Sequence, residues 1–188
     1  MGRAFLEDGD YKRARECFEK ALSIDPDRFT TWITLGALLK KNRNFDSAKE
    51  CYEKAIRISP GYAEAHYNLG NLHYDLKEDI LAERYFLKAI ELDPNRYDAW
   101  NNFGNILVRN GRFKEALKAF VNALKIKPQY GCSFYNLACM WAQMKECKKA
   151  VSALALAIEI EPHRKTMAIR DIDFDPIRKE PLFQNLVK

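Results

Sequence analysis

Three asparagines, Asn68, Asn102 and Asn136, lie 34 residues apart along the chain. A carboxamide has one acceptor oxygen and two N–H donors, so it can bind both the N–H and the C=O of a peptide group without reading the neighbouring side chain. On one surface the three residues would form a ladder for an extended peptide. Because asparagine costs about half a kcal/mol in a helix relative to alanine, three copies in phase need some compensation.

The cysteines and histidines favour packing over catalysis or metal binding. The chain has five cysteines without a C-x2-C pair, and an odd number without a secretion signal suggests reduced thiols. Cys132 and Cys139 share a helix face but stand about 10 Å apart along the axis, too far to chelate one metal ion alone. His66 and His73 fall on a predicted buried face, where packing explains them better than ligation. We therefore predict no catalytic residue, no cofactor and no metal site.

The elements that would position the asparagines follow the same 34-residue period. A period between 20 and 50 residues predicts a solenoid whose units bury their apolar faces only against their neighbours. One proline, two alanine, one mainly aromatic and one small-residue column recur in phase. They are Pro26, Pro60, Pro94, Pro128 and Pro162; Ala14, Ala48, Ala82, Ala116 and Ala150; Ala21, Ala55, Ala89, Ala123 and Ala157; Phe18, Tyr52, Phe86, Phe120 and Leu154; and Gly2, Gly36, Gly70, Gly104 and Ala138.

Each unit contains two stretches of apolar residues at helical spacing, which predicts a pair of amphipathic helices. Short polar turns such as residues 42–44 and 110–112 join the two stretches, so each pair should be an antiparallel hairpin. The glycine column permits close approach of the two backbones, and the aromatic column should fill the space beside it. Each proline lies where it blocks continuation of a second helix.

These residues resemble the tetratricopeptide repeat (TPR) signature, W-x2-L-G-x2-Y followed by A-x3-F and P. Trp32, Leu35, Gly36, Leu39, Ala48, Tyr52, Ala55 and Pro60 carry it most completely. The resemblance implies an all-α, helix-turn-helix solenoid wound as a right-handed superhelix. We expect a TPR array over residues 1–162, with a partial repeat at 1–28, repeats at about 29–62, 63–96, 97–130 and 131–164, and a capping segment at 163–188.

The resemblance also implies where a ligand binds, because the first helices of TPR folds line a concave groove. Helical geometry places a polar set on the face opposite the apolar residues of each first helix. The residues expected to bind a peptide are Glu64, Tyr67, Asn68, Asn71, Asp98, Asn101, Asn102, Asn105, Arg109, Tyr135 and Asn136. Asparagine at the ladder position is common in TPR repeats, so shared ancestry is the alternative explanation of the spacing.

The charges of this expected groove favour a basic or neutral ligand. TPR domains that bind chaperone C-termini hold the terminal carboxylate with cationic residues, whereas Glu64, Asp75 and Asp98 make the centre of this groove acidic. An aromatic ligand residue could stack on Tyr67 or Tyr135. The repeats around Asn68 and Asn102 are also similar to those of O-linked N-acetylglucosamine transferases.

The composition excludes several other classes of function. The net charge, 31 minus 26 or +5, is modest and interspersed, so we expect no nucleic-acid binding. No apolar run of 18 residues and no signal-peptide pattern is present, which suggests a soluble, cytoplasmic protein without a membrane span.

The two ends of the chain carry separate expectations. By the period, Met1 and Gly2 fall in the middle of a first helix, so Phe5 should have fewer neighbours than Leu39 or Leu107. We expect an excerpt of a longer chain; the open end could instead pair with another copy. Residues 163–188 should cover the last repeat, with Asp175-Pro176 starting a short helix. A tail that occupies the groove is the alternative.

The sequence therefore predicts a non-catalytic scaffold that binds an extended peptide segment of a partner protein in a concave groove. Two alternatives stay open. The array could be the substrate-recognition part of a larger enzyme such as a glycosyltransferase, or it could self-assemble into a homo-oligomer through its open first unit or its tail.

Overall fold

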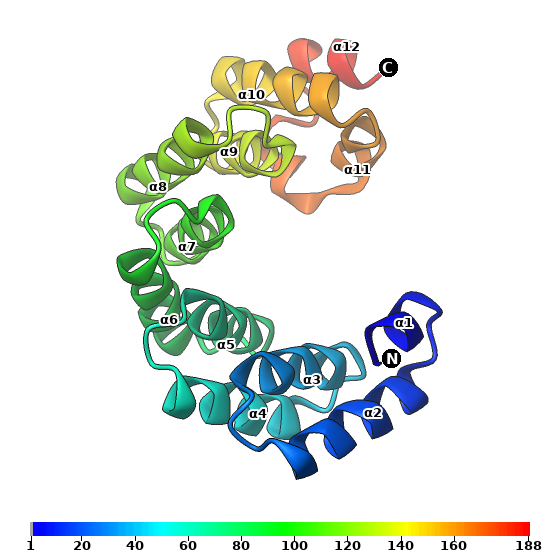
Figure 1. Ribbon diagram of the computed structural model, residues 1–188. Coiled ribbons are helices and arrows are strands. Elements are labelled where there is room, and N and C mark those ends of the chain that lie inside the picture. Colours follow the sequence, from blue (N-terminus) through cyan, green and yellow to red (C-terminus); the bar gives the residue numbers. More distant parts are fainter. Residues whose placement is uncertain (1) are drawn as a thin grey trace. The chain divides into compact units, whose positions relative to one another are not determined.

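The computed structural model describes residues 2–188, apart from the side chain of Arg3, and every element in this range is a helix (Figure 1). This confirms the all-α class, while Met1 of the expected partial repeat lies outside the described residues. The elements are α1 (Gly2–Glu7), α2 (Tyr11–Ile24), α3 (Phe29–Lys41), α4 (Phe45–Ile58), α5 (Ala63–Asp75), α6 (Asp79–Leu92), α7 (Tyr97–Arg109), α8 (Phe113–Ile126), α9 (Gly131–Gln143), α10 (Cys147–Ile160), α11 (Arg164–Arg170), the 3-10 helix η1 (Ile172–Ile177) and α12 (Pro181–Val187).

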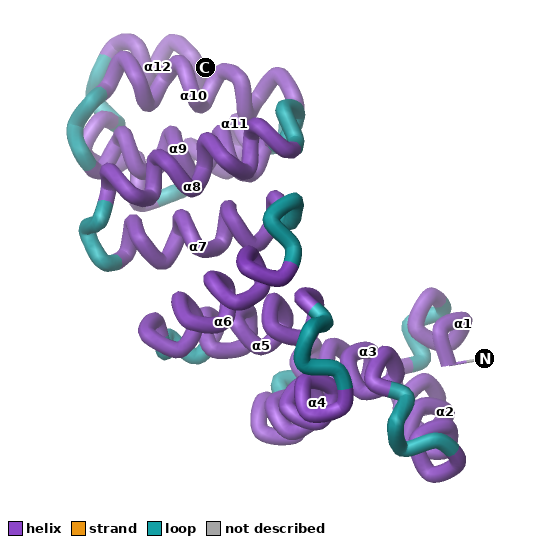
Figure 2. Tube along the Cα trace, turned by 60° about the vertical axis from the view of Figure 1, so that its left-hand side comes forward, coloured by secondary structure: helices purple, strands orange, loops and turns teal. Residues whose placement is uncertain are grey.

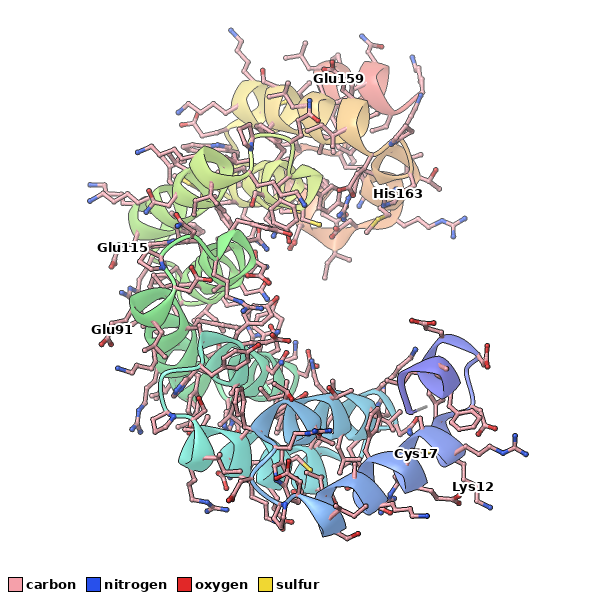
Figure 3. The ribbon with its side chains drawn as sticks, in the orientation of Figure 1. Lys12, Cys17, Glu91, Glu115, Glu159 and His163 are labelled. Atoms are coloured by element: carbon pink, nitrogen blue, oxygen red, sulfur yellow. The ribbon has the colours of Figure 1, made fainter. Side chains whose placement is uncertain are left out.

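The helices pair as the period predicts. Each first helix from α3 to α9 has 13 residues, each second helix from α2 to α10 has 14, and a short turn joins the members of a pair (Figure 2). Every second helix ends two residues before one of the five repeated prolines, whose missing N–H could not continue the helix. Lys12, Glu115 and Glu159 all lie on second helices, and their side chains project away from the ribbon (Figure 3).

The chain consists of two compact units, Met1–Pro94 and Asn95–Lys188. Unit 1 holds α1 to α6, and its core includes Leu35, Tyr52 and Leu69. Unit 2 holds α7 to α12 and η1, with Phe120 in one apolar cluster and Leu154 in another. Within each unit, a helix pair buries its apolar faces against the adjacent pair, as expected for a solenoid.

The glycine column lies against the aromatic column, as expected. A Cβ atom built on Gly36, Gly70 or Gly104 would lie 2.7, 2.8 or 2.6 Å from the ring of the aromatic residue 16 positions later in the chain. No real Cβ contact is this short, so the two helices can cross at this distance only if the first one carries glycine. In the last repeat the smaller Leu154 replaces the aromatic residue, and Ala138 replaces the glycine.

A further column, which the sequence reading missed, terminates the first helices. Residues 9, 43, 77, 111 and 145 all have a positive φ, between 59° and 77°. Each follows the C-cap of a first helix, and the next residue donates its N–H to a carbonyl five positions earlier, as Asn44 does to Leu39 at 2.9 Å. This is the Schellman motif. Only two of these five positions hold glycine, so the sequence alone does not indicate the left-handed conformation at the others.

Replacing Arg43 by glycine should therefore stabilise the protein. A residue with a Cβ is strained in the left-handed region, while glycine adds entropy to the unfolded chain, so we expect a net gain of about 0.5–1 kcal/mol. Thermal unfolding should show a midpoint about 2–4 °C higher. The reverse change in the same column, Gly111→Ala, should lower the midpoint by a similar amount; a lower midpoint for Arg43→Gly would contradict this reading.

The first and last segments depart from the regular pairs. α1 has 6 residues, and Phe5 is only partly buried, whereas Leu39 and Leu107 are 5% and 0% exposed, as predicted. At the other end, the expectation that Asp175-Pro176 starts a helix is wrong. Pro176 lies inside η1, whose N-cap Asp171 accepts from the Asp173 N–H, and the proline that begins a helix is Pro181 in α12.

Candidate peptide-binding surfaces

In unit 1 the expected binding residues lie on α5. Glu64, Tyr67, Asn68 and Asn71 are all partly buried, so each side chain has one side in contact with the protein. The Tyr62 hydroxyl donates to Glu64 Oε2 at 3.3 Å. This face of α5 is therefore a partly enclosed polar surface.

Ion pairs partly neutralise the negative charge that the sequence predicted for the groove. Asp75 Oδ2 lies 2.9 Å from Lys40 Nζ, and Asp98 Oδ1 lies 3.2 Å from Arg96 Nε. Asp98 also accepts from the Ala99 N–H at 2.8 Å, so it stabilises the first turn of α7. Two of the three acids that were expected to attract a basic ligand thus have cationic partners within the same unit.

In unit 2, Asn101 joins α7 to α9. It was expected at the edge of the groove, but its side chain is 3% exposed. Its Oδ1 accepts from Ser133 Oγ at 2.8 Å and from Asn136 Nδ2 at 3.0 Å, and its Nδ2 donates to Asn102 Oδ1 at 3.1 Å. Two rungs of the predicted ladder, Asn102 and Asn136, are therefore hydrogen-bonded to one buried amide that orients both.

Ser133 is the member of this network that the sequence reading missed. The equivalent residues of the two preceding repeats are Ala65 and Ala99. The change from alanine to serine at this buried position could have indicated a polar contact. Buried hydroxyl groups need a partner, and its hydroxyl is fully buried against Asn101.

The C-terminal segment contacts the face of α9 that was expected to line the groove. The Tyr135 hydroxyl donates to Asp171 Oδ2 at 2.8 Å, and Gln143 Nε2 donates to Asp173 Oδ1 at 3.0 Å. Tyr135 is 4% exposed, and burial, followed by the bond to Asp171, raises its pKa. Tyr135 therefore binds the C-terminal segment of its own chain and does not form an exposed edge of the groove.

The same segment also covers the flank of the last repeat. Phe174, Ile177 and Phe183 are 0–2% exposed and pack into the cluster that contains Leu154. The ring of Phe174 contacts Tyr135 edge-on, with 5.7 Å between centroids, and stacks on Phe183 at 5.3 Å. The segment thus packs against the last repeat and places two carboxylates beside the polar face of α9.

Two arginines tie this segment together. Arg164 Nη2 donates to Cys132 Sγ at 2.8 Å, and its guanidinium lies 5.1 Å from the centre of the Tyr135 ring. Arg178 Nη2 donates to the Asp171 carbonyl at 2.6 Å and its Nε donates to Asp175 Oδ1 at 2.7 Å. The contacts of these two arginines could not be predicted from the sequence, because the segment lies outside the 34-residue period.

Three of the five thiols have a raised pKa, which favours their protonated form. Burial raises the pKa of Cys51 to about 11, and burial also raises the pKa of Cys139 and Cys147. Cys139 lies close to Asp171 and Asp173, with the three potential ligand atoms within 4.8 Å of one another. Tyr135 and Gln143 already bond to the two carboxylates, so contact between the cap and α9 explains this group. A neutral thiol is a poor nucleophile.

The two core histidines pack as predicted. His66 and His73 are 7% and 2% exposed. His66 Nε2 lies 2.9 Å from the Pro60 carbonyl, and His73 Nδ1 lies 2.5 Å from Glu78 Oε2. The His73 ring also stacks on Tyr85 at 5.3 Å.

Among the helices of residues 2–188, none has both the length and the continuous apolar character needed to cross a lipid bilayer.

Comparison with protein families agrees with the helix pairs. Tetratricopeptide repeat families match residues 5–57, 63–96 and 85–118, and a further TPR repeat family matches residues 44–77. The chain is a tetratricopeptide repeat protein. A comparison with curated protein sequences finds no match.

Solved structures share the fold. The crystal structure of MamA is 23% identical with a TM-score of 0.75 and covers 88% of this chain and 97% of its own. PilW, described as a type IV pilus biogenesis factor, is 21% identical with a TM-score of 0.86, and the match covers 98% of this chain and 86% of PilW. YrrB, described as a TPR protein with an unusual peptide-binding site, is 28% identical with a TM-score of 0.68, and the match covers 86% of this chain and 83% of YrrB. These three structures therefore share the solenoid fold with this chain.

Proposed function

We propose that this chain is a non-catalytic scaffold that binds an extended segment of a partner protein on the polar faces of its first helices. The single observation that carries the proposal is the hydrogen-bonded set of Asn101, Asn102 and Asn136 in unit 2. A buried amide that fixes two neighbouring carboxamides pre-organises them, so less entropy is lost when a ligand binds. YrrB, which shares the fold, is described as having a peptide-binding site.

The spacing of the two carboxamides suits an extended peptide. Neighbouring helices pack about 8–10 Å apart and an extended strand rises about 3.3 Å per residue, so successive rungs would meet every two or three ligand residues. Asn136 uses one N–H for Asn101, which leaves its oxygen as an acceptor for a ligand N–H.

The ligand is expected to be basic or neutral. Asp171 and Asp173 lie beside α9 in unit 2, where Tyr135 and Gln143 hold their carboxylates. In unit 1, Glu64 is partly buried on α5. A basic side chain of the ligand would be attracted to either surface.

Replacing Asn102 by alanine should weaken peptide binding. A peptide selected from a random display library would be titrated by fluorescence anisotropy, and loss of one hydrogen bond should cost about 1–2 kcal/mol, or about 5- to 30-fold in Kd. The control is Asn122→Ala, since Asn122 is partly buried on the second helix α8 and should leave Kd unchanged. Equal Kd values for Asn102→Ala and wild type, with equal helicity, would contradict the proposal.

A further inference from the structure

A cavity of about 450 Å³ opens on the surface of unit 2, over α9 and α10. Its lining residues are Phe134, Leu137 and Trp141 from α9, and Lys148, Lys149, Ser152, Ala153 and Leu156 from α10. None of the residues expected to bind a peptide on the first helices lines it, so this cavity is separate from the surface proposed above.

The wall of this cavity is mainly apolar and partly open to solvent. Leu156 is 44% exposed, and Phe134 and Trp141 are only partly buried. At the base of the wall, Leu137 is 7% exposed and belongs to the apolar cluster that also holds Ala153. The wall is thus fixed to the core of unit 2, and a large apolar side chain could dock on it without rearranging the helices.

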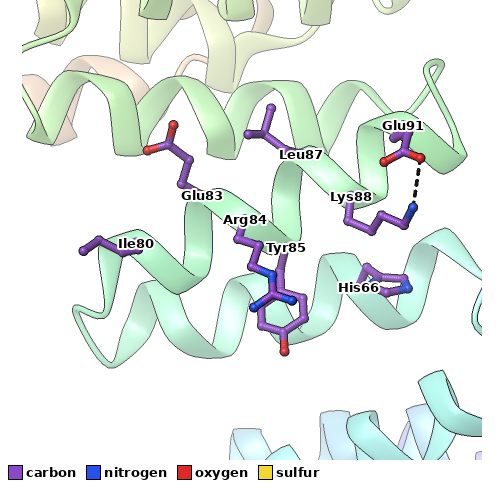
Figure 4. A pocket seen from close by; sticks show the side chains of 8 residues that line it. All are labelled: His66, Ile80, Glu83, Arg84, Tyr85, Leu87, Lys88 and Glu91. Atoms are coloured by element: carbon purple, nitrogen blue, oxygen red, sulfur yellow. Dashed lines mark hydrogen bonds and ion pairs between the residues drawn. The ribbon is translucent and has the colours of Figure 1, made fainter.

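Unit 1 has a cavity at the corresponding place, over α6 and the start of α5, and its charges are balanced. Two acids and two bases line it, as Figure 4 shows: Glu83, Arg84, Lys88 and Glu91. Lys88 Nζ lies 2.9 Å from Glu91 Oε1, so charges of this cavity pair with one another. Two repeats later, Ser152 and Leu156 stand in place of Arg84 and Lys88, which makes the unit 2 cavity less polar.

The charged residues that line the unit 2 cavity are both cationic. Lys149 Nζ lies 3.4 Å from Glu146 Oε2 and 4.5 Å from the centre of the Trp141 ring. Lys148 is exposed and forms no ion pair with any residue that the structure describes. The cavity therefore has a positive rim with one lysine available to an anionic partner.

The start of α10 adds to this positive charge. The first turns of α4, α6 and α8 hold Asp46, Asp79 and Glu115, whereas the first turn of α10 holds no acid. An acid in the first turn offsets the partial positive charge of a helix N-terminus. In α10 this charge and the two lysines lie together beside the apolar wall.

We propose that this cavity binds an acidic peptide segment of a partner protein, with one large apolar side chain on the apolar wall and a neighbouring carboxylate at Lys148. Such a segment is complementary to both features of the cavity, the apolar wall and the cationic rim. A nucleic acid or an anionic membrane surface fits less well, because each is held by a longer series of cations than the two in this lining.

The test uses three blocked tetrapeptides that separate charge from apolar contact. Glu-Phe-Glu-Glu, its analogue Gln-Phe-Gln-Gln and its analogue Glu-Ala-Glu-Glu would be titrated into isotope-labelled protein and followed by NMR. The first should shift the signals of Trp141 and Leu156, and each analogue should bind about three-fold or more weakly. Absence of binding, equal binding of the three peptides, or shifts confined to other residues would overturn the proposal.

Variants assign the two features to particular side chains. Lys148→Glu should weaken binding of Glu-Phe-Glu-Glu and leave that of Gln-Phe-Gln-Gln unchanged. The matched control is Lys12→Glu, because Lys12 is an exposed lysine at the same repeat position of α2 in unit 1. Leu156→Gln should reduce the advantage of the phenylalanine peptide over the alanine peptide. Equal effects of the Lys148 and Lys12 substitutions would refute the assignment.

Two further probes test the class of partner. Oligothymidylate and phosphatidylserine vesicles carry the anionic groups of a nucleic acid and of a membrane, and docking of a peptide predicts that neither shifts the signals of Trp141 and Leu156. Shifts caused by either probe and lost in Lys148→Glu would assign the cavity to that partner and overturn the docking of a protein. Asn102→Ala should bind all three peptides as the wild type does, which separates this proposal from peptide binding on the first helices.

Discussion

Replacing Phe174 by alanine should lower the free energy of unfolding by about 3–5 kcal/mol, the usual cost of removing a buried aromatic ring. Phe174 is 0% exposed, and its ring contacts both Tyr135 and Phe183. Its loss would leave a cavity between α9 and the C-terminal segment, so the segment should also become the first site of proteolysis. Chemical denaturation and limited proteolysis with mass spectrometry measure the two effects.

Ile172 provides the control for this prediction, because it lies two residues away in the same 3-10 helix but is 77% exposed. Ile172→Ala should change the free energy of unfolding by less than about 0.5 kcal/mol. Similar values for the two variants would mean that the segment is not packed as a cap, and the account of unit 2 would then fail.

Replacing Gly104 by alanine should destabilise the protein by about 1–3 kcal/mol, the usual cost of overpacking a core. The added Cβ would lie 2.6 Å from Cε1 of Phe120, whose ring is fully buried and cannot turn out of the way. The free energy of unfolding from denaturant titration measures the effect. Gly61→Ala is the control, because no atom lies within 4 Å of a Cβ at that position.

A second substitution distinguishes this clash from a general effect of alanine. The last repeat combines Ala138 with Leu154, so Phe120→Leu should relieve the clash in Gly104→Ala. The double variant should then be less destabilised than the sum of the two single variants, by about 1 kcal/mol or more. Additive effects would contradict the close approach of the two helices.

The helices could be predicted from the sequence because the period repeats the same physical constraints five times. At a helix crossing Gly104 must be small and Phe120 fills the space beside it, and Pro128 cannot continue a helix. The residue types at these positions therefore indicate where each helix crosses or ends. The turn after each first helix was less visible. Its left-handed position holds Arg43 or Lys77 in some repeats, and only the backbone conformation identifies it.

The candidate binding surface was predictable only in outline. The period placed Asn102 and Asn136 on first helices, but it could not show that Asn101 is buried between them. The contacts of Tyr135 with Asp171 could not be predicted either, because the C-terminal segment lies outside the repeats and its path depends on tertiary packing. The cavity lined by Trp141 and Leu156 likewise depends on side chains brought together only by the fold.

The most direct test of peptide binding compares the wild-type chain with a triple variant, Asn68→Ala, Asn102→Ala, Asn136→Ala, in a lysate pull-down read by quantitative mass spectrometry. Circular dichroism must first show equal helicity. The account predicts that at least one partner retained by the wild type is lost from the variant, because the carboxamides hold its backbone. Recovery of the same partners in equal amounts with both proteins would contradict binding on the polar faces of the first helices.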